Sequence, residues 1–432
     1  MKRLLCTALS VLLALTVTAG LSGAQADAAG GFQPRLDTDT ECEITVIGSY
    51  SNFEALEAEF DSFNEFYPDV ELNYVKPDDY NNLLGTVLEG KNAPNIFFAS
   101  PWMIGNEKYE SVMAHMEDLS DAGLGLDLEC IRPSLLNYDA QGKLSMVPIF
   151  ARNYGMLVNN DLFKKEGLSV PGTWDELLDV CETFRSRGYE SPMMGYSKDS
   201  SGSSCLMNVL VYPEVLAAVN GNPEALKAAN EMAPDGGACM RGGLEAMMEL
   251  IGKGYINLEK CGEIADNYSA VILRFFEGDV PMMICTGDTV SGTGKRESQS
   301  EAFSNAPFAY SFFPVPLSEA GGYFVDSPSI EFAVNKDCEN LEMTNELMRF
   351  LISHDELNRM ASVKRMVTPT KDLSFDSVYE PFGQVPTERV LSPEVIGITD
   401  PLAVQVRNAS FLVGTGEISI DEAVSDYGAF TD

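Results

Sequence analysis

The segment at residues 142–178 constrains the fold most, because it joins a strand, a short helix and a capped helix in one run. Thr173 and Glu176 have the spacing of a capping box, in which the hydroxyl accepts from the N3 amide and the carboxylate accepts from the N-cap amide. Apolar side chains then recur at helical spacing, at Leu177, Leu178, Cys181 and Phe184. We therefore predict a helix that begins near Trp174.

The residues before this helix predict a strand and a short helix. Residues 153–158 are a short, mostly apolar run that follows Arg152. Residues 162–167 have the length of a short helix that ends at Gly167, because glycine readily adopts the left-handed conformation of a helix end. Strand, short helix, Pro-Gly break and capped helix together make one crossover unit.

The same alternation of strand and helix precedes this segment. Residues 44–48, 70–75 and 96–99 predict strands, and a helix face made by Phe53, Leu56, Phe60 and Phe63 lies between the first two. This rhythm is typical of a mostly parallel sheet flanked by helices, so we expect an α/β fold.

The N-terminus has the pattern of a secretory signal peptide, which we assign to residues 1–29. Lys2 and Arg3 precede an apolar run at residues 4–17, and small residues follow it. That run is too short to span a membrane, which takes roughly 20 residues. The only nearby cysteine, Cys6, belongs to the apolar run and is not placed as a lipoprotein cysteine. We predict an exported protein, periplasmic or extracellular and associated with the cell surface, with a polar leader at 30–41.

Length and charge narrow the class of protein. About 400 residues remain after the signal, which is the size of two lobes with cores of their own. The net charge of −36 excludes nucleic acid as a partner, because phosphate contacts need a basic surface. Eight cysteines remain without any C-x-x-C spacing, which excludes zinc ribbons and thioredoxin-like motifs. The cysteines can form disulfides or remain buried free thiols, and the sequence does not decide between these two possibilities.

No motif for catalysis or metal binding stands out. The two histidines, His115 and His354, fit structural or solvated positions, and H-E-x-x-H, G-x-S-x-G and P-loop patterns are missing from the sequence. Residues 292–295 lack the glycine spacing of a phosphate loop. A pair of carboxylates for glycoside hydrolysis stays open, because such a pair is recognised by separation in space. We predict no catalytic residue, no metal site and no cofactor.

Several motifs give the chain a family resemblance. The central segment resembles that of the extracellular solute-binding proteins of bacterial ABC transporters, in the sugar-binding group that includes maltose-binding protein. The matching residues are Gly142, Lys143, Val147, Pro148, Asn159, Leu162, Phe163, Lys165, Gly167, Leu168, Pro171, Thr173, Trp174, Asp175 and Glu176. Further matches are Phe63, Asn64, Tyr67, Pro68 and Val70, and then Gly278, Met282 and Gly287. The chain departs from the family where an aromatic residue usually follows Gly287, since Asp288 and Thr289 stand there.

The resemblance implies a two-lobed periplasmic-binding-protein fold of type II with a ligand cleft between the lobes. It implies a monomer that binds a mono- or oligosaccharide, closes about a hinge and delivers the sugar to the permease subunits of an ABC importer. The expected parts are lobe 1 at 42–150 and 328–363, lobe 2 at 154–325 and 368–432, and crossings near 149–154, 326–330 and 363–369. The alternatives are another small solute, such as a polyamine, peptide or metal complex, and a secreted glycan hydrolase that uses Asp288 and Asp326.

The expected topology indicates where a ligand would bind. Ligands of open α/β sheets lie beyond the carboxyl ends of the strands, which here are followed by residues 49–52 and 100–103. Sugars need carboxylates and amides for their hydroxyls and flat rings for their C–H faces. Asn52 either contacts the ligand or caps the following helix. The candidate ligand-binding residues are Tyr50, Asn52, Trp102, Arg152, Tyr154, Asp288, Tyr323 and Asp326.

Overall fold

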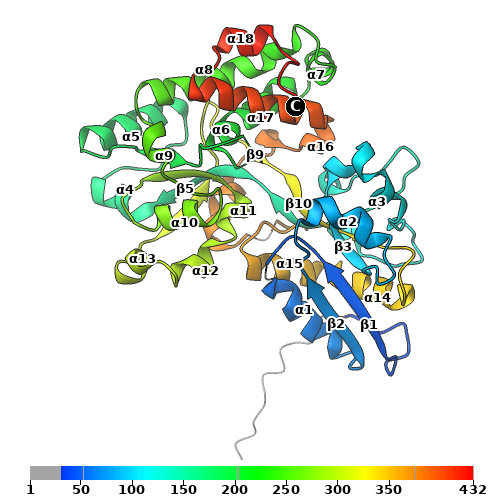
Figure 1. Ribbon diagram of the computed structural model, residues 1–432. Helices are drawn as coiled ribbons and strands as arrows, with labels where there is room; N and C mark the ends of the chain where they lie inside the picture. The colour runs from blue at the N-terminus through cyan, green and yellow to red at the C-terminus, as the bar shows by residue number, and fades with distance from the viewer. Residues whose placement is uncertain (1–30, 52, 201, 203, 374, 432) are drawn as a thin grey trace, which may run out of the picture.

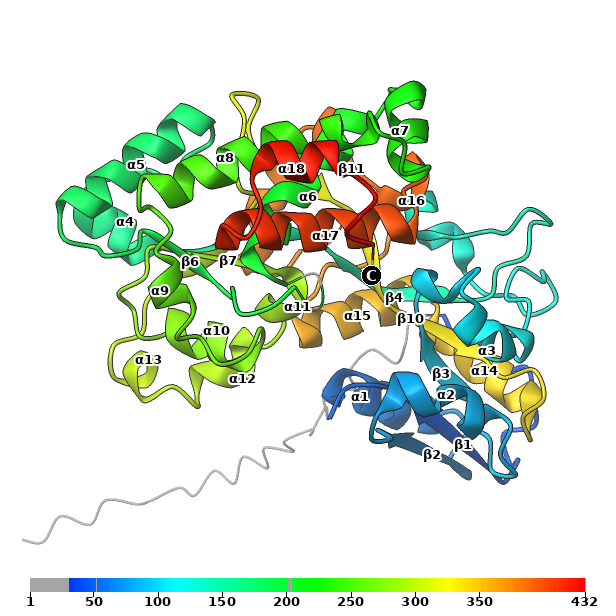
Figure 2. The ribbon, with the colours of Figure 1, turned by 45° about the horizontal axis from the view of Figure 1, so that its top comes forward.

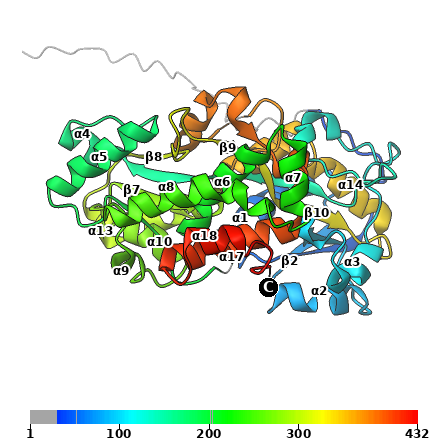
Figure 3. The ribbon, with the colours of Figure 1, turned by 90° about the horizontal axis from the view of Figure 1, so that it is seen from above.

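The computed structural model describes residues 31–51, 53–200, 202, 204–373 and 375–431, and these form two α/β lobes side by side (Figure 1). The signal peptide assigned to 1–29 and the candidate Asn52 lie outside the described residues. Seen from above, α5 (Trp174–Ser186) lies at the far end of one lobe and α14 (Leu341–Leu351) at the far end of the other (Figure 3). The sheets flanked by helices confirm the predicted α/β fold class. The sheets are mixed and not mostly parallel as expected, because in each of them one strand runs antiparallel to both of its neighbours.

The sheet of the first lobe has the strand order β2-β1-β3-β10-β4. Its strands are β1 (Cys42–Ile47), β2 (Val70–Val75), β3 (Ile96–Ala99), β4 (Val147–Arg152) and β10 (Ser327–Val334). β1 runs parallel to β2 and β3, whereas β10 runs antiparallel to both β3 and β4. β2 and β3 have the bounds that the sequence predicts, because each is a short apolar or alternating run between turn residues.

Helices pack against this sheet, and residues 32 and 33, which precede β1, pack against one of these helices. The helices are α1 (Glu54–Asn64), α2 (Tyr80–Leu88), α3 (Glu110–Ala114), α14 (Leu341–Leu351) and α15 (His354–Lys364). The ring of Phe32 lies 5.1 Å from the ring of Phe350. Arg349 lies over the Phe32 ring and donates to the carbonyl oxygen of Gln33 at 2.7 Å. The segment expected to be a polar leader therefore packs into the first lobe, because Phe32 supplies an apolar anchor.

The sheet of the second lobe has the order β6-β7-β5-β8. Its strands are β5 (Tyr154–Asn159), β6 (Met193–Gly195), β7 (Met282–Thr286) and β8 (Tyr310–Phe313), with β5 antiparallel to both neighbours. Helix α6 (Leu206–Val219) is apolar nearly all round, because it lies between this sheet and the layer of α8 (Arg241–Gly252) and α17 (Asp400–Thr415). Figure 2 shows α17 and α18 (Ile420–Ser425) over α6 and α8.

Further elements complete the second lobe. The helices among them are α4 (Asn160–Glu166), α5 (Trp174–Ser186), α7 (Pro223–Asn230), α9 (Leu258–Cys261), α10 (Ser269–Phe275), α11 (Gly287–Val290), α12 (Thr293–Glu297), α13 (Glu301–Asn305) and α16 (Pro393–Ile396). A parallel pair is formed by β9 (Phe324–Val325) and β11 (Val390–Leu391). No helix in the described part of the chain is long and apolar enough to cross a membrane.

The strand, short helix and capped helix predicted within residues 142–178 form as β5, α4 and α5, with bounds that differ by one or two residues for β5 and α4. They do not make a parallel crossover, because β5 runs antiparallel to β7 whereas β6, which follows α5, runs parallel to β7. The cap of α5 also differs in one respect. Helix α5 begins at Trp174, and the Thr173 hydroxyl accepts from the Glu176 amide at 3.4 Å. The Glu176 carboxylate, however, accepts from the Gly172 amide at 2.8 Å and not from that of Thr173, so the reciprocal half of the box is displaced by one residue. Helix α4 ends at Gly167 with φ 67°, the left-handed conformation expected there.

The chain passes between the two sheets at three places. β4 ends at Arg152 and β5 begins at Tyr154, so Asn153 alone separates the two sheets there. β10 follows β9 after Asp326. The third passage, at residues 365–370, follows α15, and the Ala151 amide donates to the Val367 carbonyl oxygen at 2.9 Å. The first and third passages thus lie side by side.

The cysteines of the described residues form no disulfide. Four of them are buried thiols, at Cys181, Cys205, Cys261 and Cys285. Burial raises the pKa of these thiols, to about 11 for Cys205 and Cys261, which keeps them protonated. Of the two possibilities left open by the sequence, the structure shows free thiols.

Candidate ligand-binding cleft

Two adjoining cavities lie between the lobes, and we refer to them together as the interlobe cleft. The larger, of about 770 Å³, is lined by Trp102 and Asn106 of the first lobe and by residues of α6 and α17 of the second. The smaller, of about 620 Å³, shares Asn106, Tyr212 and Asp400 with it. The larger cavity also contains Arg152 and Tyr154, from the first passage between the lobes. Both volumes lie in the range of small-molecule sites.

Trp102 reaches the cleft because the chain breaks directly after β3. Ser100 is extended and Pro101 opens a short turn of helix, Pro101–Met103, at the carboxyl end of the strand. The indole ring is partly exposed and meets the ring of Tyr109 edge-on, with centroids 4.9 Å apart. That contact fixes the plane of the indole and leaves part of it for a ligand.

Tyr154 and Tyr212 supply two further rings. Tyr154 is the first residue of β5 and Tyr212 lies on α6, and their centroids are 5.5 Å apart. Burial raises the pKa of Tyr212, and the charges of Glu394 and Asp400 raise it further, so its hydroxyl stays a hydrogen-bond donor. With Trp102, three aromatic rings line one cavity.

Arg152 and Asp288 form an ion pair that joins the two lobes. Arg152 Nε donates to Asp288 Oδ2 at 2.5 Å, and Ser329 Oγ donates to Asp288 Oδ1 at 2.5 Å. Arg152 and Ser329 belong to the first sheet, whereas Asp288 lies in the first turn of α11, directly after β7. Burial lowers the pKa of Arg152, but the charge of Asp288 more than offsets this, so the net shift is upward and the guanidinium is charged.

Tyr50 lies close to this ion pair without lining the cavities. Its ring packs edge-on against Phe53 and Phe98, at 5.2 and 5.7 Å, and the Lys364 ammonium lies 4.4 Å from its centroid. Burial raises the pKa of Tyr50, and the negative charge of Asp288 raises it further. The candidates Tyr50, Arg152 and Asp288 are thus brought together, as are Trp102 and Tyr154.

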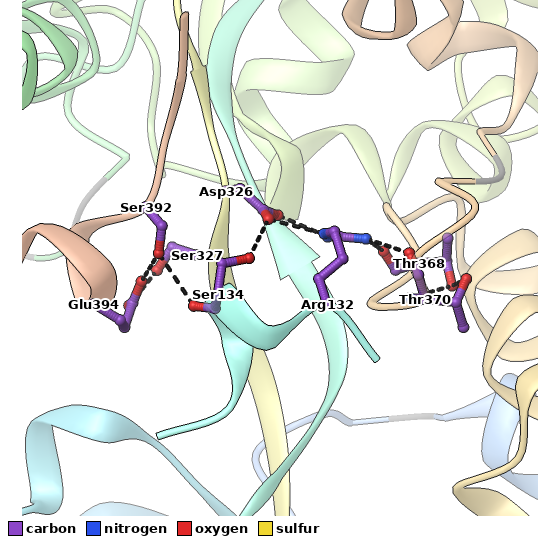
Figure 4. A network of polar contacts seen from close by, with 8 residues as sticks. All are labelled: Arg132, Ser134, Asp326, Ser327, Thr368, Thr370, Ser392 and Glu394. Carbon is purple, nitrogen blue, oxygen red and sulfur yellow. Dashed lines mark hydrogen bonds and ion pairs between the residues drawn. The ribbon is translucent and has the colours of Figure 1, made fainter. Parts of the chain in front are cut away.

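Asp326 occupies a different position. It is 2% exposed and forms a bidentate ion pair with Arg132, from Nε to Oδ2 at 2.9 Å and from Nη2 to Oδ1 at 2.7 Å (Figure 4). Arg132 Nη1 also donates to the carbonyl oxygens of Thr368 and Thr370, each at 2.7 Å. Arg132 therefore clamps the second and third passages together, and we call this group the Arg132 clamp.

Further hydrogen bonds connect the Arg132 clamp with the smaller cavity, and the first of them runs from Ser134 Oγ to Asp326 Oδ2 at 3.2 Å (Figure 4). Ser392 Oγ donates to the Ser134 carbonyl oxygen at 3.1 Å, and Ser327 Oγ donates to Glu394 Oε1 at 2.9 Å (Figure 4). Glu394 lines the smaller cavity, and burial raises its pKa. The remaining candidate, Tyr323, was expected near the cleft but lines neither of the two cavities, and it lies near Glu214. Burial raises the pKa of Tyr323, and the charge of Glu214 raises it further.

Of the second lobe's share in the larger cavity, the sequence reasoning found Tyr154 but missed the residues of α6 and α17, namely Asn208, Tyr212, Asp400 and Arg407. It also missed Asn106 of the first lobe. The signal for α17 was present, since Thr399-Asp400-Pro401 is a helix start with proline in the first turn. Which side of that helix faces the first lobe depends on packing against α6, and no local pattern gives it.

Two α/β lobes that enclose a cleft, with the chain passing between them three times, define the periplasmic-binding-protein fold. The sequence profile of the bacterial extracellular solute-binding protein family matches residues 48–357, and the chain belongs to that family. No curated protein matches the sequence significantly.

Solved structures share the whole architecture. RafE in complex with raffinose has 18% identity and a TM-score of 0.70, with 90% of this chain and 98% of that chain covered. Apo RafE from Streptococcus pneumoniae has 18% identity and a TM-score of 0.69, with 93% and 99% covered. Maltose-bound MalE3 from T. maritima has 18% identity and a TM-score of 0.65, with 90% and 99% covered. At these identities the likeness is one of fold.

Proposed function

We propose that this protein is the carbohydrate-binding component of an ABC importer, which binds a mono- or oligosaccharide outside the cytoplasm and delivers it to a membrane permease. The observation that carries the proposal is the cavity of about 770 Å³ between the lobes, lined by Trp102, Tyr154 and Tyr212 together with polar side chains. The family is one of solute-binding proteins, and the structural neighbours include proteins bound to raffinose and maltose.

The lining suits a sugar for chemical reasons. Aromatic faces pack against the C–H faces of pyranose rings, and amides, carboxylates and guanidinium groups pair with hydroxyls. Asn106, Asp400 and Arg152 supply one group of each kind at the same cavity. Although no aromatic residue follows Gly287, the rings of the second lobe come from β5 and α6 instead.

Binding would close the lobes about the three passages. We place the lobe boundaries at Asn153, at Asp326 and within residues 365–370, where the chain leaves one sheet for the other. Because the cleft is lined from both lobes, a ligand that contacts both favours the closed state. We propose that the protein acts as an exported monomer and releases its ligand unchanged to the permease.

Glycan hydrolysis by Asp288 and Asp326 is not favoured by the contacts of these two groups. Both carboxylate oxygens of Asp326 are engaged by Arg132, and both of Asp288 are engaged by Arg152 and Ser329. A general acid or a nucleophile needs a carboxyl group that can reach the glycosidic bond.

The test is a thermal-shift screen of the mature protein against mono- and oligosaccharides, polyamines, peptides and metal ions. A ligand that binds only the folded state stabilises it by about 2.7 kcal/mol at a hundredfold excess over Kd. We expect a shift with a saccharide that is recovered unchanged. A shift with a polyamine, peptide or metal ion alone would refute the carbohydrate assignment, and release of shorter glycans would refute simple binding.

A further inference from the structure

The larger cavity of the interlobe cleft has more basic than acidic side chains in its lining, although the whole chain is acidic. The smaller cavity, by contrast, is lined by the carboxylates Asp400 and Glu394. The protein carries 65 acidic and 29 basic side chains, for a net charge of −36. The larger cavity is nevertheless lined by two arginines, Arg152 and Arg407, and by a single carboxylate, Asp400. Two cations against one anion at a cavity of so acidic a protein are not expected from composition.

Arg407 is the less satisfied of the two arginines. Its Nε is buried and has no hydrogen-bond partner in the described part of the chain. Asp400 lies seven residues earlier on the same helix, which is roughly 10 Å along the axis at 1.5 Å per residue. Burial raises the pKa of Asp400 and the charge of Arg407 lowers it, so the two groups interact through space. Arg407 thus lines the cavity and forms no direct ion pair among the described contacts.

Arg152 also keeps donors for a ligand. Its contact with Asp288 uses Nε. A guanidinium has five N–H donors in a planar fork. Among the described residues no hydrogen bond engages the two terminal nitrogens of Arg152, so they can donate to another acceptor. Asp288 holds the charged side chain in place, which reduces the entropy that a ligand would have to offset. Such an arrangement suits a bidentate contact with a planar anion.

Positive charge also gathers beyond Arg152, where the first lobe faces α12 of the second. Lys364 lies over the ring of Tyr50, and Arg296 lies 5.1 Å from the ring centroid of Tyr268. Burial lowers the pKa of Lys364 and the charges of Lys295 and Arg296 lower it further, whereas the charges of Glu54 and Asp288 oppose the shift. Lys295 pairs with Glu54 at 3.7 Å, so acids that are already in place partly balance these cations.

We propose that the solute is a negatively charged saccharide, whose anionic group binds between Arg152 and Arg407 while its rings pack on Trp102, Tyr154 and Tyr212. The inference rests on the proposed function and narrows it to acidic sugars. Carboxylate, phosphate and sulfate groups share the acceptor geometry that arginine recognises, and they differ in charge and shape.

The experiment measures Kd by titration calorimetry for matched acidic and neutral probes. The probes are trigalacturonate, the galactose trimer of the same linkage, glucose 6-phosphate and inorganic phosphate. We expect an acidic saccharide to bind at least tenfold more tightly than its neutral counterpart. The preference should weaken as salt is raised, because partly exposed charges are screened. Whether trigalacturonate or glucose 6-phosphate binds better identifies the anionic group, and tight binding of inorganic phosphate alone would overturn the saccharide assignment.

Variants of Arg407 test whether the preference for acidic saccharides comes from the cleft. Arg407→Gln should lose at least tenfold in affinity for the acidic probe and little for the neutral one, whereas Arg407→Lys should keep part of the preference. Arg241→Gln is the matched control, because this arginine pairs with Glu245 and Asp421 on the outside of the second lobe. A neutral trimer that binds as tightly as the acidic one would overturn this inference and leave the proposed function standing. Binding of no saccharide at all would overturn both.

Discussion

The Arg132 clamp should be among the most costly contacts to break, and Asp326→Asn tests this with little change of shape. Removing the charge of Asp326 leaves the guanidinium of Arg132 buried without its counter-ion, since the side chains are only 10% and 3% exposed. Removing one partner of a buried ion pair costs about 3–5 kcal/mol, because the remaining charge stays desolvated. We expect a loss of this size in the free energy of unfolding.

The same structure predicts how the two partners combine. Arg132→Met alone orphans Asp326 and the carbonyl oxygens of Thr368 and Thr370, so it should cost about as much as Asp326→Asn or more. The double variant Arg132→Met, Asp326→Leu should lose less than the sum, because no unpaired charge remains. An apolar pair of similar volume often replaces a buried ion pair at little net cost.

The assay is urea unfolding followed by circular dichroism and by fluorescence, with the midpoint compared between variants. The matched control is Glu231→Gln, which breaks the exposed pair with Lys227 and should change stability by well under about 1 kcal/mol. A loss under about 1 kcal/mol for Asp326→Asn, or strict additivity in the double variant, would show that the clamp is not a desolvated ion pair.

Three further predictions concern the cleft, a buried acid and the packing of the second sheet. Trp102 and Trp174 are the only tryptophans in the sequence, so Trp102→Phe should abolish the change in fluorescence on adding ligand while Trp174→Phe keeps it; the reverse would place the ligand elsewhere. Glu331 is fully buried, and neither of its carboxylate oxygens has a hydrogen-bond partner among the described residues. Burial raises its pKa well above the usual value, and the charge of Glu394 raises it further. The pKa of Glu331 is higher in the folded state than in the unfolded state, so its contribution to stability falls as pH rises above about 4.5. Glu331→Gln should therefore raise Tm more at pH 8 than at pH 4.5. Equal shifts at the two pH values would contradict the assignment of Glu331 as a buried, protonated acid. A Cβ at Gly155 would collide with the carbonyl oxygen of Phe313 on β8, so Gly155→Ala should destabilise the protein by about 1–3 kcal/mol in urea, whereas Gly242→Ala, with open space around it, should not.

Local elements of the fold could be predicted because their signals are local. The strands β2 and β3 and the start of α5 follow from alternation, flanking turn residues and one hydroxyl cap. Phe32 escaped prediction because its neighbours are polar, and its anchoring depends on Phe350, far away in the chain. The sequence thus indicates elements better than it indicates what they pack against.

The residues of the candidate site also fall into those that local signals predict and those that depend on packing. Trp102, Arg152 and Tyr154 were found because they follow or begin strands, where the topology places ligands. Asp326 was chosen because it lies at the crossing expected near 326–330, but it is held in the Arg132 clamp. The sequence does not indicate this, because its partner Arg132 is nearly two hundred residues earlier. Tyr212 and Arg407 were missed because each sits within a helix, and only the packing of α17 on α6 turns them toward the first lobe.

The Arg132 clamp and the Arg152–Asp288 pair have different consequences for closure. The clamp joins the second and third passages and is almost fully buried, so we expect it to hold these two passages together when the lobes close. The Arg152–Asp288 pair is more exposed and joins the lobes directly beside the cavity. An anionic ligand on Arg152 would therefore act at the contact that sets how the lobes meet, without disturbing the clamp. Ligand charge and lobe closure would be coupled through one guanidinium, which is the differential contact that a closing receptor requires.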